Sequence, residues 1–135
     1  MGRLGEAVGC HRAALAIARE TGDRDGEESA LNNLGNAYLQ LGQSADAVGC
    51  YRAALVITRE FGDRYQEGEV LRNLGTAYWE SHQPEQAAAC WQEAADAMRE
   101  AGSEEQAAYL DRSAVRARHR RGRWRRWRHR PTKEV

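Results

Sequence analysis

The sequence predicts an all-α fold of stacked antiparallel helix hairpins, and three observations support this prediction. Residues 25–64 align without gaps with residues 65–104 at 14 identical positions, and residues 1–24 align with residues 41–64 at 15 of 24 positions. Within each unit, apolar side chains recur every three or four residues, which is the spacing of a helix face. Glycine-containing turns separate these stretches. A fixed period of this length is typical of arrays in which each unit buries its apolar face against its neighbours.

The unit of residues 25–64 contains two predicted helices. In the first, Leu31, Leu34 and Tyr38 form one apolar stripe, and Gly42 ends the helix. The second ends at a Gly-Asp turn and carries a stripe formed by Ala47, Val48, Tyr51, Ala54, Leu55 and Thr58. Small residues allow the two helices to approach closely and aromatic residues fill the space at the next turn, so an antiparallel hairpin is expected.

Placing the whole chain in this register predicts six helices. They span Arg3–Thr21, Arg24–Leu41, Ser44–Phe61, Arg64–Glu80, Pro84–Ala101 and Ser103 to about Arg121. Proline is favoured in the first turn of a helix, and the acidic residues after Ser103 suit the positive end of a helix dipole. The last helix keeps an apolar face of Ala107, Leu110 and Ala114, but Asp111 stands where Leu31 and Leu71 stand in the two units. It is therefore expected to be a polar cap and not a third full repeat.

The first predicted helix lacks a partner, because Met1 and Gly2 align with Leu41 and Gly42 at the start of a second helix. Its apolar stripe of Val8, His11, Leu15 and Ala18 is then covered from one side only. We expect this of a fragment of a longer array, or of a chain that self-associates through its uncovered N-terminal helix.

The repeated motifs resemble those of the tetratricopeptide repeat family. NLGNAY at residues 33–38, with Gly42, Ala47, Tyr51 and AAL at residues 53–55, matches the family signature. NLGTAY at residues 73–78 repeats it, with Ala87, Trp91 and Ala94. The period of 40 residues exceeds the usual 34, and the proline after the second helix is absent. This longer form of the repeat resembles those of kinesin light chains and of the C-terminal arrays of bacterial transcriptional regulators.

The resemblance implies a right-handed superhelix whose concave surface binds a peptide or a partner helix. The expected domain covers residues 1–117, with a truncated first repeat at 1–24, repeats at 25–64 and 65–104, and a capping helix at 103–121. The side of the first helices that faces away from the hairpin partner carries the predicted groove residues Asn32, Asn33, Asn36, Gln40, Arg72, Asn73, Thr76 and Trp79.

Two of these asparagines have a specific role in the family. In tetratricopeptide repeats, an asparagine at the position of Asn33 and Asn73 commonly bonds the backbone of an extended peptide. The alternative is that both belong to an inherited NLG motif and bond local backbone groups. The lysines with which the family holds a C-terminal carboxylate are missing, which argues against recognition of an acidic C-terminus.

The net charge of zero conceals a division along the chain. Residues 1–111 hold 9 basic and 19 acidic residues, whereas residues 112–135 hold 11 basic and one acidic. Gly122 and Pro131 predict a tail at 118–135 that is disordered or helical only in part. Arginine interleaved with tryptophan suits nucleic acid, an anionic membrane surface or the acidic body of the same chain, and a solvated tail without a binding role is the alternative. The candidate polyanion-binding residues are Arg118, Arg120, Arg121, Arg123, Trp124, Arg125, Arg126, Trp127, Arg128 and Arg130.

No motif in the sequence indicates an enzyme, a cofactor or a metal site. The four histidines are scattered, no phosphate-binding glycine motif is present, and Cys10, Cys50 and Cys90 occupy one packing position in three successive helices. The absence of a long apolar run and of a leader peptide predicts a cytoplasmic protein. We therefore expect a non-catalytic protein–protein interaction module. The alternatives are a nucleic-acid-binding accessory protein that acts through the tail, and a remnant of a larger regulator.

Overall fold

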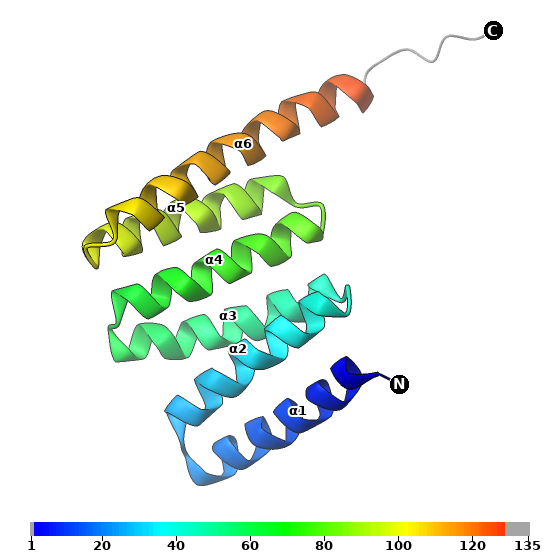
Figure 1. The fold of residues 1–135 in the computed structure, drawn as a ribbon, viewed down its shortest axis with the longest axis vertical. Helices are drawn as coiled ribbons and strands as arrows, with labels where there is room; N and C mark the ends of the chain where they lie inside the picture. Colours follow the sequence, from blue (N-terminus) through cyan, green and yellow to red (C-terminus); the bar gives the residue numbers. More distant parts are fainter. Residues whose placement is uncertain (1, 129–135) are drawn as a thin grey trace, which may run out of the picture.

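The computed structural model describes the backbone of residues 2–128 and the side chains up to Arg120. All regular structure in this part of the chain is α-helical (Figure 1), as predicted. The helices are α1 (Arg3–Thr21), α2 (Arg24–Gln40), α3 (Ser44–Phe61), α4 (Arg64–Glu80), α5 (Pro84–Glu100) and α6 (Glu104–Arg128).

The helices form a stack in which each one packs against its neighbours in the sequence. Figure 1 shows α1 at one end of this stack and α6 at the other. The helices α2, α4 and α6 begin at Arg24, Arg64 and Glu104, so the structural period equals the 40-residue period of the sequence. None of these helices combines the length and the apolar character that a membrane crossing requires.

The repeated GDR sequence explains the turn that joins one hairpin to the next. Gly22 and Gly62 follow α1 and α3 with φ angles of 69° and 71°, a left-handed conformation that glycine adopts without a steric penalty. The carboxylates of Asp23 and Asp63 then accept hydrogen bonds from backbone N–H groups in the first turn of α2 and α4, at 3.0 and 3.1 Å. The same three residues thus end one helix and begin the next.

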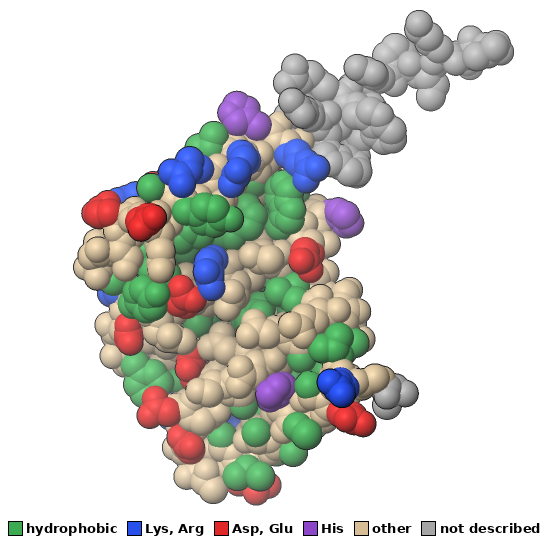
Figure 2. All heavy atoms as spheres, in the orientation of Figure 1, with side chains coloured by type: hydrophobic (Ala, Val, Ile, Leu, Met, Phe, Trp, Pro, Cys, Tyr) green, Lys and Arg blue, Asp and Glu red, His purple; other side chains and the backbone are tan. Residues whose placement is uncertain are grey.

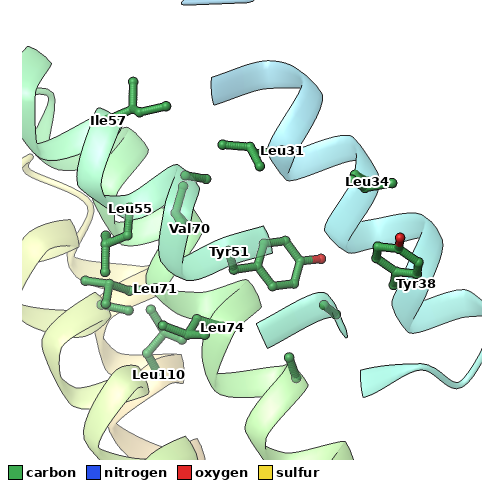
Figure 3. Close-up of a cluster of buried hydrophobic side chains, with 14 of the residues drawn as sticks. Leu31, Leu34, Tyr38, Tyr51, Leu55, Ile57, Val70, Leu71, Leu74 and Leu110 are labelled. Atoms are coloured by element: carbon green, nitrogen blue, oxygen red, sulfur yellow. The ribbon is translucent and has the colours of Figure 1, made fainter. Parts of the chain in front are cut away.

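The hairpin core depends on the predicted alternation of small and large residues. The Tyr51 side chain is fully buried and points from α3 toward α2 (Figure 3). A Cβ atom on Gly35 would lie 2.7 Å from the Tyr51 ring, so the glycine makes room for the aromatic ring. Gly75 and Trp91 form the equivalent pair in the next hairpin.

The helix α6 continues to Arg128, beyond its expected end near Arg121. Gly122 does not stop it, because a glycine inside a helix costs only about 1 kcal/mol relative to alanine and arginine is a good helix former. The predicted apolar face is buried against α5, and Ala117 extends it. Asp111 binds the Arg99 side chain of α5 at 2.6 Å instead of packing in the core.

Ion pairs that recur in each repeat connect neighbouring helices of the stack. The nearly buried Glu67 carboxylate, on a residue that is 7% exposed, accepts hydrogen bonds from Arg59 at 3.1 Å and from Arg64 at 2.8 Å. Arg64 also binds Glu100 at 2.6 Å. One repeat earlier, Glu27 is bound by Arg19 and Arg24 in the same way.

Replacing Glu67 by glutamine is expected to lower the free energy of unfolding by about 1 kcal/mol at pH 7. Burial disfavours the charged carboxylate, but the hydrogen bonds from Arg64 and Arg59 outweigh it and hold the pKa of Glu67 below its usual value. The contribution is therefore present above the ordinary pKa of a glutamate and is lost as the pH falls through the lowered pKa. Urea unfolding at pH 7 and pH 3 tests this, with Glu20→Gln at an exposed position as the control. A deficit that is the same at both pH values would contradict the ion-pair origin.

The open end of the stack is visible in α1. Ile17 is 61% exposed, whereas Ile57, at the equivalent position of α3, is 2% exposed. In the described structure, the main packing partner of α1 is α2, whereas α3 packs extensively against both α2 and α4. The predicted stripe itself is largely covered, because Leu15 and Ala18 are buried and Val8 and His11 are half-buried. The exposed large apolar side chain of α1, Ile17, lies outside that stripe.

We expect the amides of residues 8–18 to exchange with solvent at least about tenfold faster than those of residues 48–58, because α1 has fewer buried contacts to lose when it opens. Hydrogen exchange, together with sedimentation to establish the oligomeric state, measures this. A monomer in which both segments are equally protected would contradict the expectation. Slow exchange in an oligomer would show that self-association covers α1.

Candidate functional site

A groove of about 930 Å³ lies between α4 and α6, with α5 at its floor. Figure 2 shows basic side chains along α6 beside an apolar patch that extends toward α4. The residues that line the groove are Arg72, Asn73, Thr76, Trp79, Trp91, Tyr109, Leu110, Ser113, Arg116, Ala117, His119 and Arg120.

The floor of the groove is formed by two tryptophans. The ring centroids of Trp79 on α4 and Trp91 on α5 are 6.0 Å apart, and their planes are tilted by 39°. The Trp91 Nε1–H donates a hydrogen bond to the backbone oxygen of Arg72 at 3.1 Å. This bond and the close contact with Gly75 hold the Trp91 indole, whose ring gives the floor an apolar surface.

Three amide side chains on the first helices have no hydrogen-bond partner within the described part of the chain. Asn73 is half-buried and lines the groove, whereas Asn33 and Gln40 are exposed on α2. An amide side chain can donate and accept a hydrogen bond at once, which is what the backbone of an extended peptide requires. The Asn73 amide is therefore free to bind a ligand in the groove.

The groove carries three arginines. Arg72 on α4 forms an ion pair with Glu69 at 2.9 Å. On α6, Arg116 donates to the Ser113 hydroxyl at 3.3 Å, and the Arg120 guanidinium lies 5.2 Å from the centre of the Trp79 ring. Among the side chains described, no carboxylate lies within 4 Å of the Arg116 or Arg120 nitrogens. The α6 side of the groove is thus basic.

The tetratricopeptide repeat family model matches residues 1–60 and 27–100. The chain belongs to the tetratricopeptide repeat family. The crystal structure of BtubC (BKLC) from P. vanneervenii is similar in fold, with a TM-score of 0.64 and 20% sequence identity. The match covers 99% of this chain and 62% of the BtubC chain, so this chain spans less than two thirds of that protein. No curated protein matches the sequence.

Membership of the family confirms the resemblance seen in the repeated motifs. Tetratricopeptide repeats generally mediate protein–protein interactions and are not catalytic. The groove lies between α4 and α6, with α5 between them, and the family match covers α4 and α5 but ends before α6.

The groove brings together half of the predicted binding residues. Arg72, Asn73, Thr76 and Trp79 line it, but the four residues predicted on α2 do not. Asn36 accepts a hydrogen bond from the Tyr51 hydroxyl, and the Asn32 amide donates to Glu28. Asn33 and Gln40 are exposed on α2. Asn32 and Asn36 therefore have structural partners.

Sequence reasoning missed the residues that α5 and α6 contribute. Trp91 was identified only as part of the repeated signature, and α6 as a polar cap followed by a tail. The tetratricopeptide register contained the signal, because adding 40 to Asn73 and Thr76 gives Ser113 and Arg116. The same step from Trp79 gives His119, which also lines the groove.

The structure describes the side chains of two residues from the predicted polyanion-binding tail. Arg118 donates to the Gln92 side chain of α5 at 2.6 Å, and Arg120 lies against Trp79. Both engage the body of the same chain. The side chains of Arg121, Arg123, Trp124, Arg125, Arg126, Trp127 and Arg128, and all of Arg130, lie outside the described part of the structure.

The three cysteines are free thiols. Cys10 is exposed, whereas Cys50 and Cys90 are half-buried. Burial raises the pKa of Cys90 to about 11, so this thiol stays protonated near neutral pH. In the part of the chain that the structure describes, no cluster of three His, Cys, Asp or Glu side chains is suited to hold a metal ion.

Proposed function

We propose that this protein is a non-catalytic protein–protein interaction module that holds an extended peptide in the groove between α4 and α6. The single observation that carries this proposal is that the free Asn73 amide lines the same groove as the paired indoles of Trp79 and Trp91. The family's general role in protein interaction supports it.

The two features serve different parts of a bound peptide. The Asn73 amide would bond the peptide backbone, which every sequence offers. The two indoles present an apolar surface on which one side chain of the peptide would lose its contact with water, and aromatic anchors of this kind supply much of the energy in peptide recognition. An extended segment suits this division because its side chains alternate in direction and leave the backbone accessible.

Asn73→Ala is expected to weaken binding of a groove ligand at least about fivefold, because one or two hydrogen bonds to the ligand backbone are lost. Asn33→Ala is the matched control, since it removes the same side chain one repeat earlier at a position that does not line the groove. Surface substitutions of this kind change the free energy of unfolding by less than about 0.5 kcal/mol, so both variants should keep the wild-type melting temperature. Calorimetric titration measures the affinities. Equal losses in both variants would contradict the assignment to this groove.

The alternative of a nucleic-acid-binding tail has less support among the described residues. Arg118 binds Gln92 and Arg120 lies over Trp79, so both exposed side chains contact the body of the same chain. Arg120 instead adds positive charge to the groove.

A further inference from the structure

We propose that the groove selects an acidic peptide segment, in which two carboxylates at alternate positions meet Arg116 and Arg120 while an apolar side chain packs on Trp79 and Trp91. This inference rests on the proposed function and names the class of ligand.

The first support is the state of the arginines. Arg19, Arg24, Arg59, Arg64 and Arg99 all bind carboxylates of this chain. In the described structure, Arg116 and Arg120 bind none, although both line the groove. Their charges are therefore available to a ligand, and arginine binds carboxylates through strong, oriented hydrogen bonds.

The second support is a match of spacing. Arg116 and Arg120 are one helical turn apart on α6, which corresponds to about 6 Å along the helix axis. In an extended peptide, residues at positions i and i+2 point to the same side and are about 6.6 Å apart. A peptide with acidic residues at positions i and i+2, and any residue between them, would therefore present one carboxylate to each arginine. The intervening side chain points to the other side.

The chain as a whole favours a short acidic ligand over a nucleic acid. Residues 1–111 carry 9 basic and 19 acidic residues, so the surface on the α1 to α5 side of the groove repels a long polyphosphate. A peptide of a few residues stays within the groove and meets mainly its arginines, because free charges are screened over about 8 Å at physiological salt.

The test is a selection of random dodecapeptides displayed on phage against the full 135-residue chain, with counter-selection against the Trp79→Ala variant. The variant keeps the whole basic segment of residues 112–135, so peptides that bind only that segment are removed. The inference predicts that the remaining peptides share two acidic residues at i and i+2 beside an apolar residue. Remaining peptides that are neutral or basic would overturn the inference and leave the proposed function intact. If the selection yielded no peptide that binds the wild-type chain better than the Trp79→Ala variant, the proposed function itself would be overturned.

Two single variants then assign the charge. Arg116→Gln should weaken a selected peptide at least about tenfold, because a charge-assisted hydrogen bond is lost. Arg118→Gln is the matched control, because it removes the same charge only two residues further along α6. The Arg118 side chain binds Gln92 and does not line the groove. It should change the affinity less than about twofold. Equal losses in both variants, or displacement of the peptide by single-stranded DNA at lower concentration than by free peptide, would overturn the inference.

Discussion

Replacing Tyr51 by alanine is expected to lower the free energy of unfolding by about 4 kcal/mol, the largest effect that we predict for a single substitution. The side chain is 0% exposed and fills the space between α2 and α3, against the backbone of Gly35. Its loss leaves a cavity between α2 and α3, which these helices can fill only by shifting toward each other. Urea unfolding followed by circular dichroism measures the change.

Two controls separate the cavity from other causes. Tyr51→Phe removes only the hydroxyl that donates to Asn36, and Asn36 is exposed and regains water, so the cost should stay below about 1.5 kcal/mol. Val56→Ala removes an apolar group from a side chain that is 60% exposed on the same helix and should cost less than about 0.5 kcal/mol. A loss for Tyr51→Ala no larger than that for Val56→Ala would contradict the packing described.

Replacing Trp79 by alanine is expected to weaken binding of a peptide ligand by about tenfold or more. The side chain forms half of the aromatic floor and also supports the guanidinium of Arg120. Its removal takes away both the apolar contact and the orientation of one cation. Fluorescence anisotropy with a labelled peptide from the selection described above measures the affinity.

Leu39→Ala is the matched control for this substitution. Leu39 occupies the position of Trp79 one repeat earlier, is also partly buried, and does not line the groove. We expect it to reduce stability by a similar amount and to leave the affinity unchanged. If both variants lost affinity in parallel with stability, the effect of Trp79→Ala would be one of folding and not of contact with the ligand.

The helices were predictable because local and repeated signals agree in this chain. The GDR turn ends one helix with a left-handed glycine and begins the next with a capping aspartate, and it occurs at both Gly22 and Gly62. The alternation of Gly35 with Tyr51 likewise predicted the close approach within the hairpin. The end of α6 was harder to predict, because Gly122 stops a helix only where the following backbone turns, and that depends on tertiary contacts.

Of the residues that line the candidate groove, only those on α4 were predicted from the sequence. The residues of α4 followed from helix periodicity, which places Arg72, Asn73 and Thr76 on the side away from the core. The contribution of α6 was missed because its arginine density was interpreted as the start of a tail, although Arg116 and Ser113 are in register with the α4 residues. The same register also predicted binding residues that the groove does not contain. Asn32 and Asn36 are equivalent to Arg72 and Thr76, but they bond Glu28 and Tyr51 instead. The Tyr51 partner of Asn36 belongs to the neighbouring helix, which periodicity within one helix does not specify, whereas Glu28 lies one turn before Asn32 on α2 itself.

The claim that the groove between α4 and α6 holds the partner is tested most directly by nuclear magnetic resonance of the four tryptophan indole N–H groups during titration with a bound peptide. Trp79 and Trp91 belong to the floor of the groove, whereas Trp124 and Trp127 belong to the basic C-terminal segment. We predict shifts of the Trp79 and Trp91 signals, together with those of the backbone amides of Asn73 and Arg116. Shifts confined to Trp124 and Trp127, with Trp79 and Trp91 unchanged at saturation, would contradict the claim.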